Sequence, residues 1–383
     1  MPVESIITGI AAEIVLASSR ECPADRALRE RLRAERGLSA EKKRVISRAV
    51  FAYFRWFGWL NPEHPLPAQI EHALKLADDF AERPRTFSDE KLVACVAPGW
   101  VNGLMRITPG WARAIQAEPK LWLRAKKGQG RALAKELGNC LIPPEPMFAD
   151  ALEYRGNEDL FRAPEFHAGE FEVQDISSQM VGLLCDPQPG ETWWDACAGE
   201  GGKTLHLSDL MANRGLIWAS DRASWRLQLL KRRAGRAKVF NYRAANWAGG
   251  PKLPTRTKFD GVLVDAPCSG VGTWQRNPHA RWTISPEDVK ELADIQKRLL
   301  ANVASAVKPG GRLIYAVCTL TRAETLEVGR AFQNSQAEFE PIPLKCPFGE
   351  KSGDLPASAA SMTLWPQDCG GNGMFMAAWR RRA

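Results

Sequence analysis

From Val173 to the C-terminus, strand-like apolar patterns alternate with helical patterns, and this alternation constrains the fold more than any other feature of the chain. Such alternation is typical of a mainly parallel sheet with helices on both faces. We therefore predict a doubly wound α/β domain. Its expected strands are Thr192–Ala196, Leu216–Ser220, Lys238–Tyr242, Gly261–Asp265 and Arg312–Val317, with Met374–Trp379 as an antiparallel edge strand.

The N-terminal part of the chain lacks this alternation. Apolar residues recur at helical spacing over Ile6–Val15 and Ile46–Phe57, which indicates amphipathic helices. We assign residues 1–97 to a helical domain. A strand pattern at Leu121–Arg124, followed by a helical pattern, assigns residues 98–172 to a small α+β module. The doubly wound domain then comprises residues 173–383.

Charge and cysteine content restrict the class of partner. The formal net charge is +8 and the pI is about 9.0, which favours a polyanion such as RNA. Arginine and lysine crowd residues 26–48, a plausible RNA-facing side. No apolar run reaches the length of about 20 residues that crosses a bilayer. The nine cysteines are scattered without a CxxC pair, so we expect reduced thiols, no metal site and a cytoplasmic protein.

A glycine-rich segment, Asp195–Thr204, follows a predicted strand and opens a predicted helix, as in ligand loops of α/β proteins. A P-loop would end like Gly202–Thr204, but it needs a glycine where Cys197 stands. A dinucleotide loop would begin like Gly199–Gly201, but it needs a third glycine where Thr204 stands. S-adenosylmethionine is a third ligand that uses the same crevice. The missing first glycine disfavours the P-loop, and the loop by itself does not choose between a dinucleotide and S-adenosylmethionine.

A carboxylate, Asp221, ends the second predicted strand about twenty residues beyond the loop. An acid at this place can bind the ribose hydroxyls of either a dinucleotide or S-adenosylmethionine. The same residue can also serve only as a helix cap.

Two cysteines follow successive predicted strands: Cys268, in the segment that begins at Asp265, and Cys318. A buried cysteine is ordinarily apolar filler, but two at the ligand edge beside a cofactor loop favour covalent catalysis. A thiolate that adds to carbon 6 of a cytosine makes carbon 5 nucleophilic enough to accept a methyl group. Asp265 is positioned to protonate the base at nitrogen 3. The residues alone leave open which cysteine is the nucleophile.

Six motifs in a fixed order resemble those of the bacterial ribosomal RNA cytosine-5 methyltransferases of the Sun (RsmB-like) group. They are Val173–Gln179, Asp195–Thr204, Asp265–Gly270, Arg276–Trp282, Lys308–Tyr315 and Cys318–Glu324. The helical region at the N-terminus is similar to the antiterminator-type RNA-binding domain of the small-subunit enzymes. The resemblance implies a Rossmann-like methyltransferase domain that acts on RNA, with ribosomal RNA favoured and transfer RNA as the alternative. We also expect a monomer.

The resemblance implies a role for each catalytic candidate. Cys318 would be the nucleophile, and Cys268 would assist release of the methylated product. Asp265 would contact both the target base and the cofactor, and Lys203 would order the site. The cofactor would be S-adenosylmethionine, bound by Cys197, Ala198, Gly199, Glu200, Gly201, Gly202 and Lys203, with Asp221 on the ribose.

Three departures from the family pattern bear on these assignments. The family usually has Ala-Pro where this chain has Gly199 and Glu200, and threonine where it has Val317. The aspartate expected near the adenine is missing, and Asn246 is the nearest polar candidate. A catalytically silent RNA-binding factor is the alternative class of function, and loss of either cysteine would have favoured it.

Overall fold

The computed structural model describes residues 5–35, 37–344, 346–348 and 361–383. Contacts divide the chain into two compact units, residues 1–119 with 270–288 and residues 120–269 with 289–383. The division into a helical domain (residues 1–97), a small α+β module (residues 98–172) and a doubly wound domain (residues 173–383) remains a prediction. By contacts, the helices that precede residue 120 belong to the first unit, and the small sheet that follows belongs to the second.

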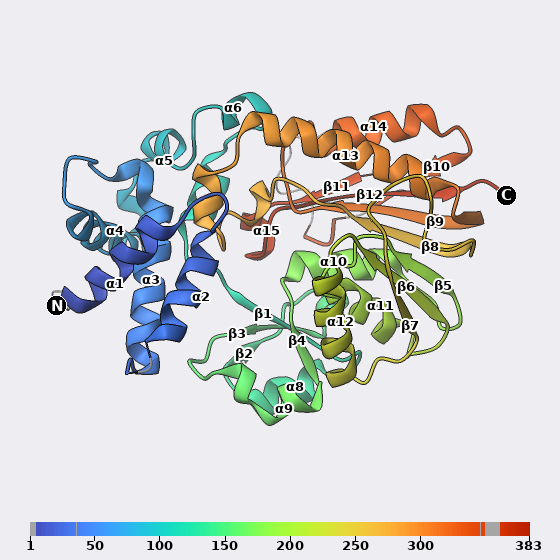
Figure 1. Cartoon of the computed structure of the whole chain (residues 1–383), viewed down its shortest axis with the longest axis horizontal. Coiled ribbons are helices and arrows are strands. Elements are labelled where there is room, and N and C mark those ends of the chain that lie inside the picture. The colour runs from blue at the N-terminus through green and yellow to red at the C-terminus, as the bar shows by residue number, and fades with distance from the viewer. Residues whose placement is uncertain (1–4, 36, 345, 349–360) are drawn as a thin grey trace. The chain divides into compact units, whose positions relative to one another are not determined.

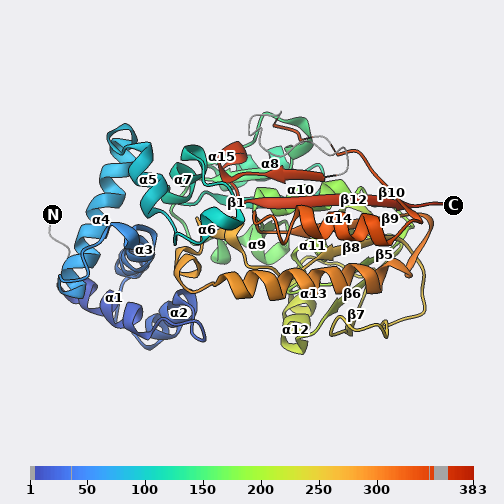
Figure 2. The ribbon, with the colours of Figure 1, turned by 90° about the horizontal axis from the view of Figure 1, so that it is seen from above.

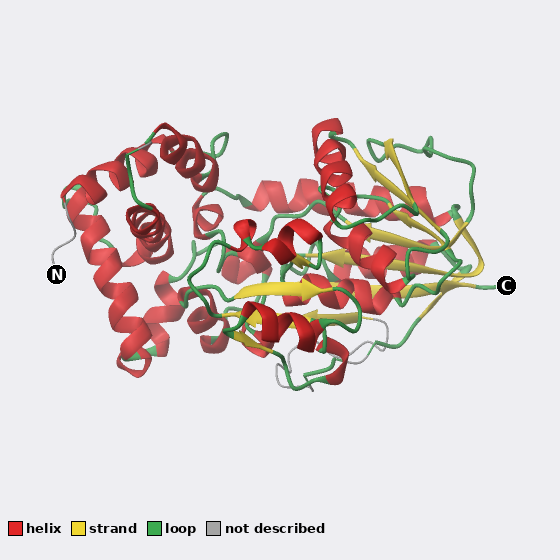
Figure 3. Ribbon diagram, turned by 90° about the horizontal axis from the view of Figure 1, so that it is seen from below, coloured by secondary structure: helices red, strands yellow, loops and turns green. Residues whose placement is uncertain are grey.

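The first unit is helical in its described part, as Figure 3 shows. Its helices are α1 Ser5–Ala17, α2 Ala24–Ala34, α3 Ala40–Trp56, α4 Leu66–Glu82, α5 Asp89–Cys95, α6 Val101–Leu104 and α7 Pro109–Gln116. Ser39 caps α3, because its side chain accepts the backbone N–H of Lys42. The buried face of α3 includes Ile46, Val50 and Phe54, so the predicted apolar stripe is confirmed.

A segment from much later in the sequence, residues 270–288, completes this unit. Arg281 anchors the segment: its side chain is fully buried, and it donates hydrogen bonds to backbone carbonyls of Trp274, Arg55, Val96 and Ile115. Buried donors must find acceptors. The buried guanidinium therefore fixes residues 270–288 among the N-terminal helices.

The second unit begins with a small antiparallel sheet in the order β2-β3-β1-β4. Its strands are β1 Leu121–Ala125, β2 Cys140–Leu141, β3 Ala151–Tyr154 and β4 Phe171–Val173, with helices α8 Gly130–Leu137 and α9 Pro164–Ala168. The predicted strand at Leu121–Arg124 is confirmed.

The main sheet has eight strands, in the order β10-β12-β9-β8-β5-β6-β7, with β11 also paired to β12. Strands β5 to β9 are parallel, and β10 to β12 are antiparallel. They are β5 Thr192–Asp195, β6 Leu216–Asp221, β7 Tyr242–Asn246, β8 Phe259–Asp265, β9 Val307–Val317, β10 Phe339–Pro341, β11 Ser361–Leu364 and β12 Met374–Arg381.

Helices cover both faces of this sheet (Figures 1 and 2). They are α10 Ile176–Cys185, α11 Gly202–Leu210, α12 Ser224–Arg236, α13 Pro286–Ala304, α14 Leu326–Ser335 and α15 Pro366–Cys369. Because side chains alternate along a strand, Trp194 packs in the core beneath α13 and α14, whereas Trp193 packs in the core beneath α10 and α11. The doubly wound fold predicted from the sequence is confirmed.

Two details of the predicted strands are wrong. The strand expected at Lys238–Tyr242 is β7, and it begins only at Tyr242, because Lys238 has a positive φ of 57° and ends the turn after α12. Val239 is buried against α12 and does not belong to the sheet. The C-terminal strand is antiparallel as expected, but β12 lies between β9 and β10 and is not an edge strand.

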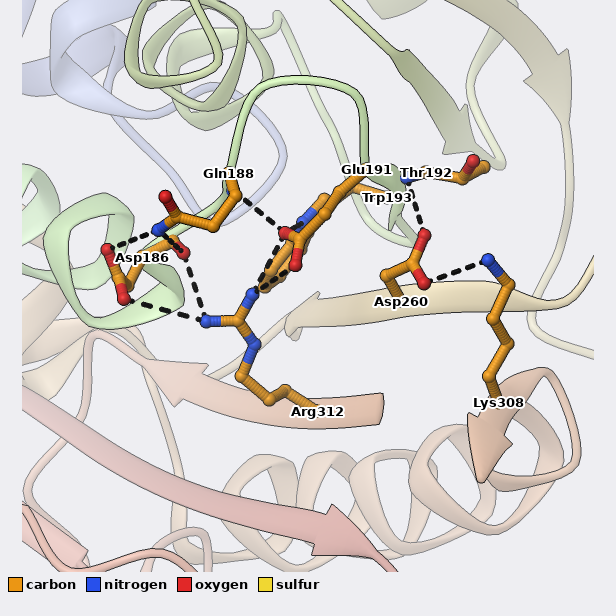
Figure 4. A network of polar contacts seen from close by, with 8 residues as sticks. All are labelled: Asp186, Gln188, Glu191, Thr192, Trp193, Asp260, Lys308 and Arg312. Carbon is orange, nitrogen blue, oxygen red and sulfur yellow. Dashed lines mark hydrogen bonds and ion pairs between the residues drawn. The ribbon is translucent and has the colours of Figure 1, made fainter. Parts of the chain in front are cut away.

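Polar contacts hold the amino ends of the central strands together (Figure 4). Both oxygens of Glu191 accept hydrogen bonds from Arg312 at 2.9 Å. Asp260 accepts the backbone N–H of Thr192 at 2.8 Å and pairs with Lys308 at 2.8 Å. This network fixes the relative positions of β5, β8 and β9 at the end opposite to the carboxyl edge.

None of the helices in the described part of the chain is long and apolar enough to cross a bilayer.

Candidate active site

The carboxyl edge of the parallel strands gathers most of the predicted site residues. Strands β5, β8 and β9 are neighbours in the sheet, so the loops that follow Asp195, Asp265 and Val317 leave the sheet side by side. The glycine loop follows β5, Cys268 follows β8, and Cys318 follows β9. This edge is where open α/β sheets bind their ligands.

The structure brings the two candidate cysteines into contact. The sulfur atoms of Cys268 and Cys318 lie 3.4 Å apart, and both residues are half-buried. The hydrogen bond with Cys268 lowers the pKa of Cys318, and the charge of Lys203 acts in the same direction. Burial and the negative charge of Asp265 oppose the shift. The net effect is a lowered pKa of Cys318, which favours the thiolate, the reactive form of the residue.

This arrangement predicts the pH dependence of thiol alkylation. The rate for Cys318 should rise with pH through a midpoint below that of an ordinary cysteine. Cys268→Ala should move this midpoint upward by on the order of one pH unit, because it removes a hydrogen bond to a charged group. The measurement is the iodoacetamide labelling rate of the Cys318 peptide from pH 6 to 10, with Cys22→Ala as control. Equal midpoints in Cys268→Ala and the control would contradict the assignment.

A half-buried ion pair lies beside the cysteines. Lys203, in the first turn of α11, donates to Asp265 over 2.6 Å. Burial alone would lower the pKa of Lys203, but the charge and hydrogen bond of Asp265 outweigh it and raise that pKa. Lys203 therefore remains a cation. It links the glycine loop to the loop that carries Cys268.

The glycine loop has a backbone that only glycine adopts readily. Gly199 and Gly201 have φ values of 56° and 88°. A Cβ atom at Gly199 would lie 2.8 Å from the guanidinium of Arg226, and one at Gly201 would lie 2.6 Å from Leu230. The backbone can therefore approach a ligand here without side chains between them. Cys197, in the same loop, has a pKa that burial raises, so it remains a neutral thiol.

The other predicted cofactor residues surround this loop. Asp221 is buried, and its carboxylate accepts the backbone N–H groups of Gly199 at 3.0 Å and Ala223 at 2.8 Å. It therefore holds the loop as well as ending β6. Asn246 lies opposite Asp221 in the β6–β7 register and donates to Ser224. Glu200 is exposed, which agrees with a side chain that faces solvent.

One oxygen of a buried carboxyl group at this edge lacks a hydrogen-bond partner in the part of the chain that the structure describes. Asp195 is fully buried, and one of its oxygens accepts the hydroxyl of Thr204 at 2.7 Å. The other oxygen has no hydrogen bond among the described residues. Burial raises the pKa of Asp195 to about 7. A buried polar atom without a partner is costly, and a bound ligand with an ammonium group would supply the missing donor.

Sequence reasoning gave no role to Glu324, which the structure places behind the two cysteines. Its fully buried carboxylate contacts Ser269 and Thr319, the residues that directly follow Cys268 and Cys318. The sequence feature that could have indicated Glu324 is its place as an acidic residue at the end of the motif Cys318–Glu324.

Within the described part of the chain, no group of three or more histidine, cysteine or carboxylate side chains is placed to hold a metal ion.

Comparisons with solved structures support the fold. The solved structure of PH0851 matches with a TM-score of 0.78 and 25% identity over 98% of each chain. A methyltransferase homolog protein from Pyrococcus horikoshii matches with a TM-score of 0.60 and 27% identity over 71% of this chain and 90% of that protein. The fold and the site together define a Rossmann-like methyltransferase.

The family follows from sequence comparison. A family model described as 16S rRNA methyltransferase RsmB/F matches residues 182–380, more than half of the chain. This chain belongs to that family, so the resemblance to the RsmB-like group is confirmed. A probable ribosomal RNA small subunit methyltransferase B of Synechocystis sp. is 37% identical over 219 residues, 56% of this chain and 48% of that protein. The chain spans about half the length of the curated relatives it matches.

Proposed function

We propose that this protein is an S-adenosylmethionine-dependent RNA (cytosine-5) methyltransferase that acts on ribosomal RNA. The observation that carries the proposal is the pair of thiols 3.4 Å apart beside the Lys203–Asp265 ion pair and the glycine loop. Simple methyl transfer to nitrogen or oxygen needs no cysteine. Methylation of carbon 5 needs a nucleophile on carbon 6, and a second thiol suits the release of that nucleophile.

Each reacting residue has a defined task in the proposed reaction. The Cys318 thiolate forms a bond to carbon 6, and the electron pair of the carbon 5–carbon 6 double bond is displaced into the ring. Nitrogen 3 takes up a proton from solvent, and the Asp265 carboxylate, held by Lys203, accepts a hydrogen bond from that N–H and so stabilises the adduct. S-adenosylmethionine, when bound, supplies the methyl group to carbon 5. Cys268 is the candidate base that accepts the carbon 5 proton. The electron pair of that C–H bond re-forms the carbon 5–carbon 6 double bond, the carbon 6–sulfur bond breaks, and Cys318 leaves as the thiolate while nitrogen 3 gives up its added proton.

The residues present fit the proposed cofactor. The run Cys197–Lys203 would hold its methionine and ribose parts, and Asp221 would accept the ribose hydroxyls. Asn246 would lie on the adenine side. The unpartnered oxygen of Asp195 supports a ligand that carries an ammonium group, as the methionine part does. These assignments explain why the loop needs glycine and why a buried carboxylate stands at its base.

Ligand selectivity tests the cofactor assignment. The purified protein should bind S-adenosylmethionine and should not bind ATP or NAD, because the loop lacks the first P-loop glycine and the third dinucleotide glycine. Asp221→Asn should weaken binding about tenfold, the effect of losing roughly 1.4 kcal/mol of hydrogen bonding. Isothermal titration calorimetry with all three ligands decides the matter. Tight binding of ATP alone would disprove the assignment.

The target RNA requires a separate test. Bisulfite sequencing of ribosomal and transfer RNA from a deletion strain should show the loss of one or more 5-methylcytosines, with ribosomal RNA as the expected location. Complementation with the wild-type chain should restore the modification, and complementation with Cys318→Ala should not. An unchanged methylation pattern in every RNA would instead support a catalytically silent RNA-binding factor.

A further inference from the structure

The two cysteines lie beyond the regular part of the sheet. The last backbone hydrogen bond between the β8 and β9 segments runs from the N–H of Ala266 to the carbonyl of Ala316, at 3.0 Å. Cys268 and Cys318 both follow this point, in loops that have no ladder between them. Their sulfur atoms nevertheless lie 3.4 Å apart. Side chains must therefore hold the two loops together.

Glu324 makes that connection. One of its carboxylate oxygens accepts the backbone N–H of Ser269 at 2.8 Å. The other accepts the hydroxyl of Ser269 and the hydroxyl of Thr319 at 3.1 Å. The Ser269 and Thr319 hydroxyls also lie 2.9 Å from each other. One buried side chain thus binds the residue that follows each cysteine.

Glu324 is itself held rigidly. Gln296, on α13, donates to its carboxylate at 3.1 Å and to the backbone carbonyl of Pro267 at 2.9 Å. The hydroxyl of Tyr315 donates to the backbone carbonyl of Glu324 at 2.6 Å and lies 3.0 Å from Gln296. Glu324, Gln296 and Tyr315 are all fully buried. The carboxylate therefore has one fixed position relative to both loops.

The donors around Glu324 are neutral. Besides Ser269, Thr319 and Gln296, the hydroxyl of Thr321 donates to this carboxylate at 2.9 Å. In the described part of the chain, the carboxylate's hydrogen-bond donors are all neutral groups. A buried carboxylate without a cation is costly unless its oxygens are fully hydrogen-bonded. A carboxylate accepts at both oxygens, whereas an amide accepts at only one. The site therefore suits glutamate better than glutamine.

We propose that Glu324 is a positioning residue that sets the spacing of Cys268 and Cys318 through Ser269 and Thr319. The consequence for methylation rests on the proposed function, but the spacing itself does not. It can be measured with a reagent that needs two adjacent thiols. Phenylarsine oxide forms two arsenic–sulfur bonds to such a pair, and its oxygen leaves as water with the two thiol protons.

The test compares capture of the Cys268–Cys318 pair in five proteins. Wild type should bind phenylarsine oxide, and Cys268→Ser, which lacks the pair, sets the background. Glu324→Ala should weaken capture at least tenfold. Glu324→Gln should fall between, because its amide nitrogen cannot accept from the surrounding donors. The matched control is Glu327→Gln, an exposed glutamate on α14, which should behave as wild type. Mass spectrometry of the cross-linked peptides identifies the pair.

A further variant tests the same proposal in case Glu324→Ala does not fold. Ser269→Ala combined with Thr319→Val keeps Glu324 but removes its hydroxyl contacts, and it should also weaken capture. Circular dichroism and the affinity for S-adenosylmethionine report whether each fold is intact. Wild-type capture in folded Glu324→Ala or in folded Ser269→Ala/Thr319→Val would overturn the proposal.

Methylation kinetics separate this inference from the proposed function. In Glu324→Gln, kcat should fall while KM for RNA and the affinity for S-adenosylmethionine stay near wild type, because the change acts on the thiols and not on either ligand. A wild-type protein that never methylates RNA but shows the predicted arsenical pattern would contradict the proposed function and support this inference.

Discussion

Replacement of Cys318 by alanine should reduce methylation of RNA by roughly a thousandfold or more, as expected when a covalent nucleophile is removed. Affinity for S-adenosylmethionine should stay within about twofold of wild type, because Cys318 acts on the base. Single-turnover methyl transfer to the RNA target and calorimetric titration of the cofactor measure the two effects. Cys22→Ala, which changes a cysteine of the helical unit, is the control. Methylation by Cys318→Ala at the wild-type rate would exclude a nucleophilic role for this residue.

Replacement of Cys268 by alanine should have a different effect: the protein should accumulate as a covalent complex with its RNA. If Cys268 assists release, its loss leaves the Cys318 sulfur attached to carbon 6. The 3.4 Å separation of the two sulfur atoms supports this division of roles, since a group that assists release must lie beside the bond that breaks. Denaturing electrophoresis detects the adduct, which ordinary phosphate contacts do not survive.

The opposite assignment gives the opposite pattern. If Cys268 is the nucleophile, Cys318→Ala should be trapped on RNA and Cys268→Ala should not. The double variant Cys268→Ala/Cys318→Ala has no nucleophile in either case and should give no adduct, which makes it the control for other cross-links. Cys197, another cysteine near the site, is not expected to substitute, because burial raises the pKa of its thiol.

Much of the fold was accessible from local sequence patterns. The parallel strands, the helices between them and the N-terminal helices follow from hydrophobic periodicity, which local steric and burial preferences determine. The exception, β7, shows the limit of that method. Its predicted position rested on an apolar run around Val239, yet that residue is buried against α12, and a run of four or five residues does not reveal which neighbour will bury it.

Part of the candidate site could also be predicted from local sequence patterns, and part of it could not. Its loops could be predicted because each follows a strand, and parallel strands expose their carboxyl ends at one edge. The sequence alone therefore determined that Asp195, Asp221, Asp265 and the two cysteines belong to one edge. Distances across that edge, such as 3.4 Å between sulfur atoms and 2.6 Å from Lys203 to Asp265, depend on strand order, which local patterns do not encode.

Three features were decided only by the tertiary structure. Strand β12 lies inside the sheet because β10 pairs with its outer side. Residues 270–288 belong to the helical unit because buried Arg281 finds its acceptors in segments that are far away in the sequence. Glu324 gains its role because the loops after β8 and β9 converge on it. In each case the deciding contacts join residues that are distant along the chain or folded back by a loop, and the composition and spacing of a sequence do not specify such contacts.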